Sequence, residues 1–317
     1  MADSRPYSQV FARLRSAAAA GLALLALVWG PAWIGPYWGL VVFTALLQGT
    51  VALSYDLIGG YGGELHLGHG LFFGLGAYLS AGMLTAGLPA WTTPVLSGFG
   101  GAAVALALCP LLIPLRGIPF AIASLAALLL MGLLAGNLSS LTGGHAGLSL
   151  MPRWGLPGLL RAAFLLMAAT GWMHYCYPNS RHGRALRAVA DDREAAAAMG
   201  VNPSQLRRQA LILGAFPAAV AGSLYPFQSA YISPQSAFGL EAAMAPVAMV
   251  LVGGPGSRWG PLLGLVLLTA VQEWLWTQGW QWRLSMWGAV LVMAGVLLPH
   301  GLAGLFPIKQ RSGRSEG

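Results

Sequence analysis

The chain has 317 residues, of which 8% carry charge and 56% are hydrophobic, and its formal net charge is +8 at pH 7. Soluble domains carry charge on roughly a quarter of their residues, so this composition excludes a soluble enzyme, a disordered tail protein and a collagen-like or disulfide-stapled fold. Charge-free runs at residues 117–152, 209–240 and 284–308 each reach the roughly 20 residues that cross a bilayer as a helix. We therefore predict a polytopic membrane protein.

Hydropathy predicts about ten membrane-crossing helices. Residues 1–16 form a cytoplasmic segment before an uncleaved first helix near 17–34. Further crossings are expected near residues 37–58, 71–88, 92–113, 118–136, 158–177, 209–232, 240–252, 261–279 and 285–305. A transmembrane domain then covers residues 17–306, and a cytoplasmic tail covers 307–317. The segment 240–252 is short, so it and its successor could instead form a re-entrant pair.

The basic residues support one orientation, since they accumulate in cytoplasmic loops. With both termini inside, 14 Lys and Arg fall on the cytoplasmic side, and only Arg153, Arg161 and Arg283 fall outside. The positive net charge thus requires no nucleic-acid partner. Nine of the 12 tryptophans fall near predicted outer ends, as in an aromatic belt in contact with lipid, although the same rim could dock an external partner.

Glycine is concentrated in residues 59–78, at positions 59, 60, 62, 63, 68, 70, 74 and 76, and smaller clusters recur at 141–148 and 252–264. This density predicts interrupted helices, which often line solute pathways, or close helix packing. Both can hold. We expect the broken segments to line part of a substrate path, with these candidate residues: Tyr61, Gly62, Glu64, His66, Gly68, His69, Thr142, Gly143 and Gly144.

The segment 178–208 holds nine of the 26 charged residues and is the most polar part of the chain. We predict that Asp191 caps a helix of about two turns with Glu194 as its reciprocal partner. Gly200 would end this helix in the left-handed conformation, and Pro203 would prevent its continuation. Such a short helix suits a groove on another protein, and an ordinary solvated loop is the alternative.

Several other functions find little support in the sequence. The sole lysine, Lys309, lies in the tail, so no Walker motif is present. Asp56, Glu64 and Glu273 could carry protons in a secondary transporter, but capping broken helices or facing an aqueous vestibule explains them better. His66 and His69 could ligate haem only with facing partners, and a lipid-modifying enzyme would need a second acidic cluster. Cys109 and Cys176 lie in apolar stretches and indicate neither a disulfide framework nor a metal site.

Five segments that occur in order carry a family resemblance: SYDLIGGYGGELHLGHGLFFGLGAYLS, LTGGHAGL, HGRALRAVADDREAAAAMGV, AGSLYPFQSAYISPQSAF and VLVGGPGSRWGPLLG. Together they resemble the permease subunits of branched-chain amino acid ABC importers, in particular the M-type subunit. The resemblance spans about residues 51–264. It implies an all-α transmembrane bundle like that of type II importers, in a bacterial inner membrane, which moves branched-chain amino acids and is not itself an enzyme.

The resemblance also implies partners: a second, H-type permease, two cytoplasmic ABC ATPases that hold ATP and Mg²⁺, and a periplasmic solute-binding protein. The family's coupling segment matches Gly183, Arg184, Glu194, Ala195, Ala196 and Gly200, which overlaps the capped helix that begins at Asp191. Glu64 and His66 stand where relatives usually carry uncharged polar residues such as Gln and Ser. Urea, short amides and other amino acids therefore stay open as substrates.

Overall fold

A computed structural model describes residues 35–150, 154–278, 283–297 and 301–305. The predicted first helix at 17–34 and the terminal segments 1–16 and 307–317 lie outside the described residues. The long helices, in chain order, are α2 (Pro36–Gly59), α3 (Gly70–Thr85), α4 (Thr93–Leu112), α5 (Gly117–Asn137), α7 (Leu156–Cys176), α10 (Pro203–Ser229), α12 (Leu240–Gly253), α13 (Gly260–Thr277) and α14 (Arg283–Leu297). Shorter elements connect them: α6 (Ser139–Thr142), α8 (Arg181–Asp191), α9 (Arg193–Ala198), α11 (Pro234–Phe238), the 3-10 turns η1 (Gly144–Ala146), η2 (Tyr177–Asn179) and η3 (Leu302–Leu305), and the strands β1 (Leu148–Ser149) and β2 (Tyr231–Ile232).

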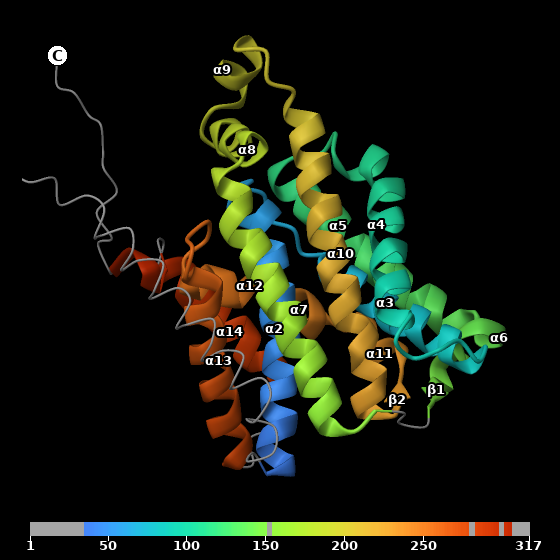
Figure 1. Cartoon of the computed structure of the whole chain (residues 1–317). Helices are drawn as coiled ribbons and strands as arrows, with labels where there is room; N and C mark the ends of the chain where they lie inside the picture. Colours follow the sequence, from blue (N-terminus) through green and yellow to red (C-terminus); the bar gives the residue numbers. More distant parts are fainter. Residues whose placement is uncertain (1–34, 151–153, 279–282, 298–300, 306–317) are drawn as a thin grey trace, which may run out of the picture.

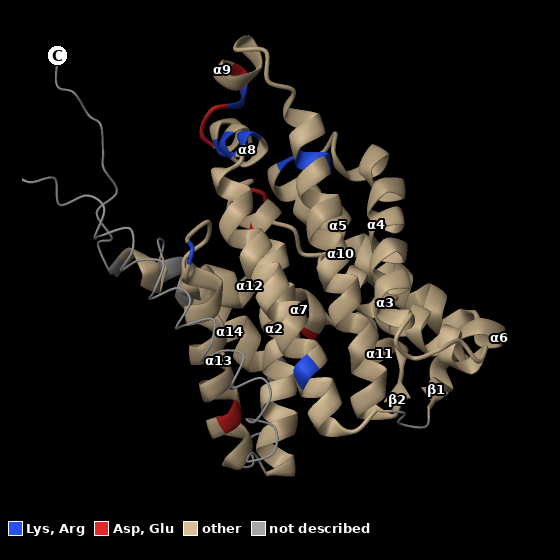
Figure 2. Ribbon diagram, viewed as in Figure 1, with Lys and Arg blue, Asp and Glu red and all other residues tan. Residues whose placement is uncertain are grey.

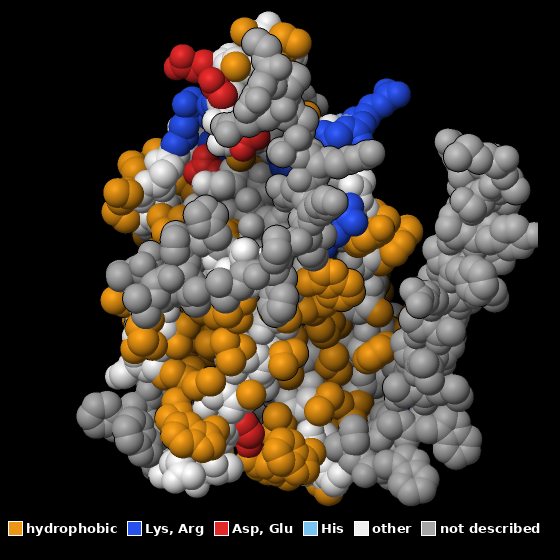
Figure 3. All heavy atoms as spheres, turned by 90° about the vertical axis from the view of Figure 1, so that its left-hand side faces the viewer, with side chains coloured by type: hydrophobic (Ala, Val, Ile, Leu, Met, Phe, Trp, Pro, Cys, Tyr) orange, Lys and Arg blue, Asp and Glu red, His pale blue; other side chains and the backbone are white. Residues whose placement is uncertain are grey.

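The long helices lie side by side as a bundle, as expected for an all-α membrane protein (Figure 1). In the described part of the chain, six helical stretches are long and apolar enough to cross a membrane, and the apolar α3 is shorter. An all-helical, multi-pass architecture is therefore confirmed, whereas the predicted count of about ten crossings stays a prediction. Hydrophobic side chains cover the middle of one face, with charged side chains at its upper end (Figure 3).

Helix α10 forms the centre of the bundle, and it packs against α2, α3, α4 and α7. Its crossing with α3 is close, because a Cβ atom on Gly76 would lie 1.9 Å from the carbonyl oxygen of Ala219. A Cβ on Gly222 would lie 1.8 Å from the carbonyl oxygen of Phe73. Only glycine allows backbones to approach this closely. Close packing thus accounts for part of the glycine cluster at 59–78.

The predicted interruption of helix within that cluster is confirmed. Helix α2 ends at Gly59 and α3 begins at Gly70, with irregular chain between them. A second break was not expected: α11 ends at Phe238, Gly239 is extended, and α12 begins at Leu240. The bundle therefore contains a broken helical stretch beside the one that the glycine pattern predicts.

The two ends of the bundle differ. At one end, β1 and β2 pair antiparallel and tie the chain after α5 to the chain after α10. At the other end, α8 and α9 project beyond α7 and α10 (Figure 1). Charged residues gather at this α8–α9 end and are sparse along the bundle (Figure 2). This end corresponds to the segment 178–208, for which we predict a cytoplasmic position.

Candidate functional site

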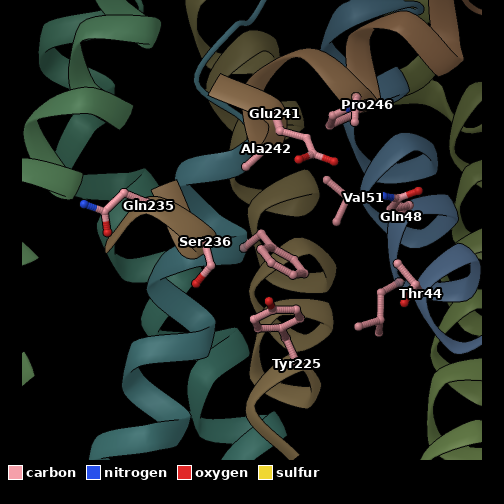
Figure 4. Close-up of a pocket in the computed structure, with 12 residues that line it drawn as sticks. Thr44, Gln48, Val51, Tyr225, Gln235, Ser236, Glu241, Ala242 and Pro246 are labelled. Carbon is pink, nitrogen blue, oxygen red and sulfur yellow. The ribbon is translucent and has the colours of Figure 1, made fainter. Parts of the chain in front are cut away.

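A cavity of ≈ 260 Å³ lies between α2, α3, α10 and the broken α11–α12 stretch. Its walls combine apolar and polar side chains, contributed by Thr44, Leu47, Gln48, Val51, Phe73, Tyr225, Gln235, Ser236, Glu241, Ala242, Ala245 and Pro246. Figure 4 shows Glu241 of α12 on the side of the cavity that faces Val51 and Gln48 of α2, with Tyr225 of α10 on another wall. The cavity is thus assembled from segments about 200 residues apart in the chain.

The break at Gly239 explains why a carboxylate can occupy this position. Glu241 lies in the first turn of α12, where the helix dipole stabilises negative charge. Gln48 lies near the middle of α2 and supplies an amide to the same cavity. Mostly apolar walls with a few polar groups are typical of small-molecule sites. Such a site suits a small solute with one apolar end and one charged or polar end.

The predicted path residues lie elsewhere. Tyr61, Gly62, Glu64, His66, Gly68 and His69 belong to the irregular segment between α2 and α3, and none of them lines this cavity. Thr142, Gly143 and Gly144 form the turn after α5, where the Thr142 hydroxyl donates to the carbonyl oxygen of Leu138 at 2.7 Å. The first group lies between the end of α2 and the start of α3, where His69 reaches Ser54 inside the bundle, and the second group follows the end of α5. Their role in the substrate path stays a prediction.

Glu64 connects three parts of the chain. Its Oε1 lies 3.2 Å from Nη2 of Arg207 in α10, and its Oε2 accepts a hydrogen bond from the amide of Gly117 at 3.3 Å. Arg207 is buried and also donates to the carbonyl oxygens of Ile113, at 2.8 Å, and Leu115, at 2.9 Å. The unusual acid in the glycine-rich segment therefore anchors the start of α10.

Two further arginines lie near this pair. Partial burial and the nearby Arg116 lower the pKa of Arg193, whereas Glu64 raises it. Glu64 is thus an anion surrounded by Arg116, Arg193 and Arg207. These arginines account for a charged residue in this glycine-rich segment.

His66 and His69 are buried and contact each other, with ring centroids 5.5 Å apart. His69 Nε2 lies 2.9 Å from the hydroxyl of Ser54, and His66 packs against Phe72 and Phe120. In the described part of the chain, no group of three or more His, Cys, Asp or Glu is placed to hold a metal ion. The histidines sit in an aromatic cluster, and the haem alternative gains no support from their contacts.

The other two carboxylates that could carry protons also have partners. Asp56 of α2 and His174 of α7 form a buried pair with Oδ2 and Nε2 2.7 Å apart, and Asp56 Oδ1 accepts a hydrogen bond from Gly256 N at 3.0 Å. Glu273 accepts a hydrogen bond from the hydroxyl of Tyr37. These carboxylates tie elements together, and the proton-coupled alternative gains no support from them.

The polar segment contains a helix that the sequence analysis did not predict. Helix α8 begins after Ser180, whose hydroxyl accepts a hydrogen bond from Gly183 N at 3.0 Å. Gly183 is buried against Tyr177 and Pro178 of η2, while Arg184 is exposed and donates to the carbonyl oxygen of Asn179. A usable signal was present: α8 buries Gly183, Leu186 and Val189 at spacings of three residues and exposes its arginines, which is the pattern of an amphipathic helix.

The predicted capped helix exists as α9, but its N-cap prediction was wrong by one residue. Asp192, not Asp191, accepts hydrogen bonds from Glu194 N at 2.9 Å and Ala195 N at 3.0 Å. Asp191 cannot cap α9, because it is the last residue of α8. Gly200 has φ +82° and ends the helix in the left-handed region, as predicted.

Helix α9 has one inner and one outer face. Ala196 is buried, whereas Glu194, Ala195 and Gly200 are exposed. Met199, which follows the helix, is 85% exposed and is the most exposed large hydrophobic residue that the structure describes. A methionine and several alanines at the tip of a charged segment form an apolar surface suited to a protein partner.

Sequence reasoning missed the cavity residues. Gln48 interrupts a long apolar run, and Glu241 follows Gly239 at the start of another, so each was a local signal of a polar group inside a bundle. What the sequence does not show is that these two runs meet. Likewise His174 was not singled out, although it pairs with Asp56 across 118 residues of chain.

Comparison with known proteins matches the sequence of this chain to one family. A family model described as the permease component of the branched-chain amino acid transport system matches residues 37–297. The high-affinity branched-chain amino acid transport system permease protein LivM of Salmonella typhimurium is 28% identical over 302 residues, covering 84% of this chain and 70% of that protein. LivM of Escherichia coli K12 is 26% identical over the same length, with the same coverage.

A second type of permease also matches. The Escherichia coli K12 protein LivH of the same transport system is 28% identical over 243 residues, covering 69% of this chain and 78% of that protein. No solved structure gave a significant match. With a family model that spans most of the bundle, the chain belongs to the family of branched-chain amino acid transport permease components.

Proposed function

We propose that this chain is one of two permease subunits of an ATP-driven importer and that it moves hydrophobic amino acids of the branched-chain type. Its relatives include both LivM and LivH permeases, which supports pairing with a second, related permease. ATP and Mg²⁺ would bind to two separate cytoplasmic ATPases, and a periplasmic solute-binding protein would deliver the substrate. The α8–α9 end would then face the cytoplasm, together with both termini.

The observation that carries the substrate proposal is the composition of the cavity between α2, α3, α10 and the α11–α12 stretch. Leu47, Val51 and Phe73 supply apolar walls for an aliphatic side chain. Glu241 supplies negative charge and Gln48 a neutral hydrogen-bonding group for the polar end of an amino acid. Urea has no aliphatic part to fill the apolar wall, so the cavity favours a hydrophobic amino acid over urea.

The docking proposal rests on the exposed face of α9. Ala195 of α9 and Met199, which follows the helix, are exposed apolar residues at the end of the bundle where the charges gather (Figure 2). A short helix that is marginal alone in water becomes stable when it lies in a partner's groove. The arginines of α8 would fix its orientation through charge.

The test of the substrate role uses cells that express this chain with its partner subunits and take up radiolabelled leucine, isoleucine, valine or urea. Glu241→Gln keeps the shape of the side chain and removes its charge, and we expect leucine uptake to fall about tenfold. The matched control is Glu273→Gln at the far end of α13, which should leave uptake near the parent value. Uptake of urea but not of leucine by the parent system would refute the proposed substrate.

The test of the docking role is co-purification of the ATPase subunits. Met199→Glu places a charge on the exposed apolar tip and should reduce co-purified ATPase strongly. Ala196→Leu is a poor probe of docking, because Ala196 is buried and the change would disturb the packing of α9 itself. Trp91→Glu, at an exposed site on the opposite end, is the control. Unchanged co-purification of Met199→Glu would contradict docking at α9.

A further inference from the structure

A chain of contacts connects the projecting α8 to the interior of the bundle. The guanidinium carbon of Arg187 in α8 lies 4.6 Å from the ring centroid of Tyr61. The Tyr61 ring is buried and lies 5.2 Å, between centroids, from the His174 ring of α7. His174 in turn pairs with Asp56 of α2. Four residues therefore join three helices and the irregular segment after α2.

The same chain of contacts reaches a fourth element, the turn between α12 and α13. Asp56 accepts a hydrogen bond from the backbone amide of Gly256, which lies in this turn. The approach is close, because a Cβ atom on Gly60 would lie 1.9 Å from Asp56 Oδ1 and 2.2 Å from Gly256 N. Two of the glycine clusters seen in the sequence, at 59–78 and 252–264, thus meet at this carboxylate.

A parallel contact holds the other side of the turn. The guanidinium carbon of Arg258 lies 4.9 Å from the ring centroid of Tyr175, near the end of α7. Its Nη2 lies 3.4 Å from Oδ1 of Asn179, in the connection from α7 to α8. The turn after α12 is therefore held on one side by Asp56 and on the other by the start of the α8 region.

The physical properties of these contacts suit them to transmit movement between helices, and not only to hold the helices together. Protein interiors are close-packed and have low compressibility, so a displaced buried group moves its neighbours. Asp56 and His174 are both almost fully buried, and neither can separate from the other without leaving a polar group unpaired. Arg187, by contrast, is exposed on α8, where a motor subunit would act. The four residues run from the surface to a buried carboxylate–imidazole pair.

We propose that Arg187, Tyr61, His174 and Asp56 form the link by which movement of α8 reaches α2, α7 and the α12–α13 turn, with Tyr61 and His174 as positioning residues for ATP-coupled transport. This inference rests on the proposed docking of an ATPase at the α8–α9 end. Helices α2 and α12 also carry cavity residues, so the link ends on two of the elements that line the substrate site.

The test uses the full complex of both permeases and the ATPases in proteoliposomes, with amino acid uptake and ATP hydrolysis measured on the same vesicles. Arg187→Gln and Tyr61→Leu each remove one side of the cation–π contact, and we expect uptake per ATP hydrolysed to fall about fivefold. Arg187→Lys keeps the cation and Tyr61→Phe keeps the ring, so both should retain the parent ratio within about twofold. The matched control is Arg208→Gln. Arg208 is also an exposed arginine, and it lies near the start of α10, outside the proposed link.

A merely structural role would lower assembly and leave the ratio of uptake to hydrolysis intact. An unchanged ratio in Arg187→Gln would overturn the proposal, and so would an equal fall in the Arg208→Gln control. The double variant should fall no further than either single variant, because both break one contact; independent, multiplying effects would count against the link. If the complex that carries Tyr61→Leu does not assemble, the comparison of Arg187→Gln with Arg187→Lys tests the proposal, since Arg187 is exposed.

The inference and the proposed function fail differently. If the ATPases do not co-purify with the parent chain, the proposed function is wrong. If they co-purify and hydrolyse ATP while every link variant keeps the parent ratio, only the link is wrong.

Discussion

Arg207 and Glu64 form an ion pair, with Nη2 3.2 Å from Oε1, at the point where α10 enters the bundle. Arg207 is 1% exposed, and its guanidinium also stacks over Phe120, 5.2 Å from the ring centroid. Removing one partner of a buried ion pair leaves the other charge uncompensated. The relationship therefore predicts unequal effects of substitutions at its two ends.

We expect Arg207→Leu to destabilise the purified chain by about 3–5 kcal/mol, because it removes the partner of Glu64 Oε1 and the donor to two carbonyl oxygens. Glu64→Gln should cost less, about 1–3 kcal/mol, since the amide oxygen still accepts from Arg207 although the buried guanidinium loses its counter-charge. Thermal unfolding in detergent, followed by tryptophan fluorescence, compares them. Equal losses for the two variants would show that the carbonyl contacts contribute little.

The corrected cap of α9 gives a second prediction. Asp192→Ala removes the side chain that accepts from Glu194 N and Ala195 N, and should destabilise α9 by about 1 kcal/mol. Asp191→Ala, one residue earlier, should have little effect on α9. Hydrogen exchange of the α9 amides should therefore quicken in the first variant alone. Faster exchange in the Asp191 variant would restore the capping role that the sequence first suggested for it.

Substitutions of two glycines on α3 distinguish the effect of close helix packing on stability from the effect of helix propensity. Gly76→Ala should destabilise strongly, by about 1–3 kcal/mol or more, because its Cβ would meet the backbone of α10 at Ala219. Gly82→Ala has open space around its Cβ and should stabilise α3 by about 0.5–1 kcal/mol. Size-exclusion profiles after heating would rank both against the parent. A tolerated Gly76→Ala would mean that α3 and α10 can separate at little cost.

The cavity can be tested by filling it. Ala245→Leu adds volume to a lining position of a cavity of ≈ 260 Å³, and should lower the maximal uptake rate about tenfold without loss of assembled complex. Ala107→Leu makes the same change at an exposed position on α4 and should leave uptake near the parent value. Normal uptake by the Ala245 variant would place the substrate path outside this cavity.

Most helix positions could be predicted because the length of an apolar run is a local property. The stretch expected at 37–58 is α2 at Pro36–Gly59, and that expected at 118–136 is α5 at Gly117–Asn137. Helix α8 escaped prediction because its arginines break the apolar run and leave only an amphipathic pattern. The prediction of Asp191 as the cap of α9 was wrong because Asp191 still belongs to α8, and the sequence pattern alone does not fix where α8 ends.

The sequence alone determined that this is a helical membrane protein, which segments are apolar enough to cross, where the charges gather and which family it resembles, because composition and motif order are properties of the linear chain. The tertiary structure decided which polar groups meet. Asp56 pairs with His174, 118 residues away in the chain, and Glu64 pairs with Arg207. Glu241 and Gln48 line the same cavity. A buried charge is stable only beside its partner, and the crossing of helices, not the spacing along the chain, sets which partner that is.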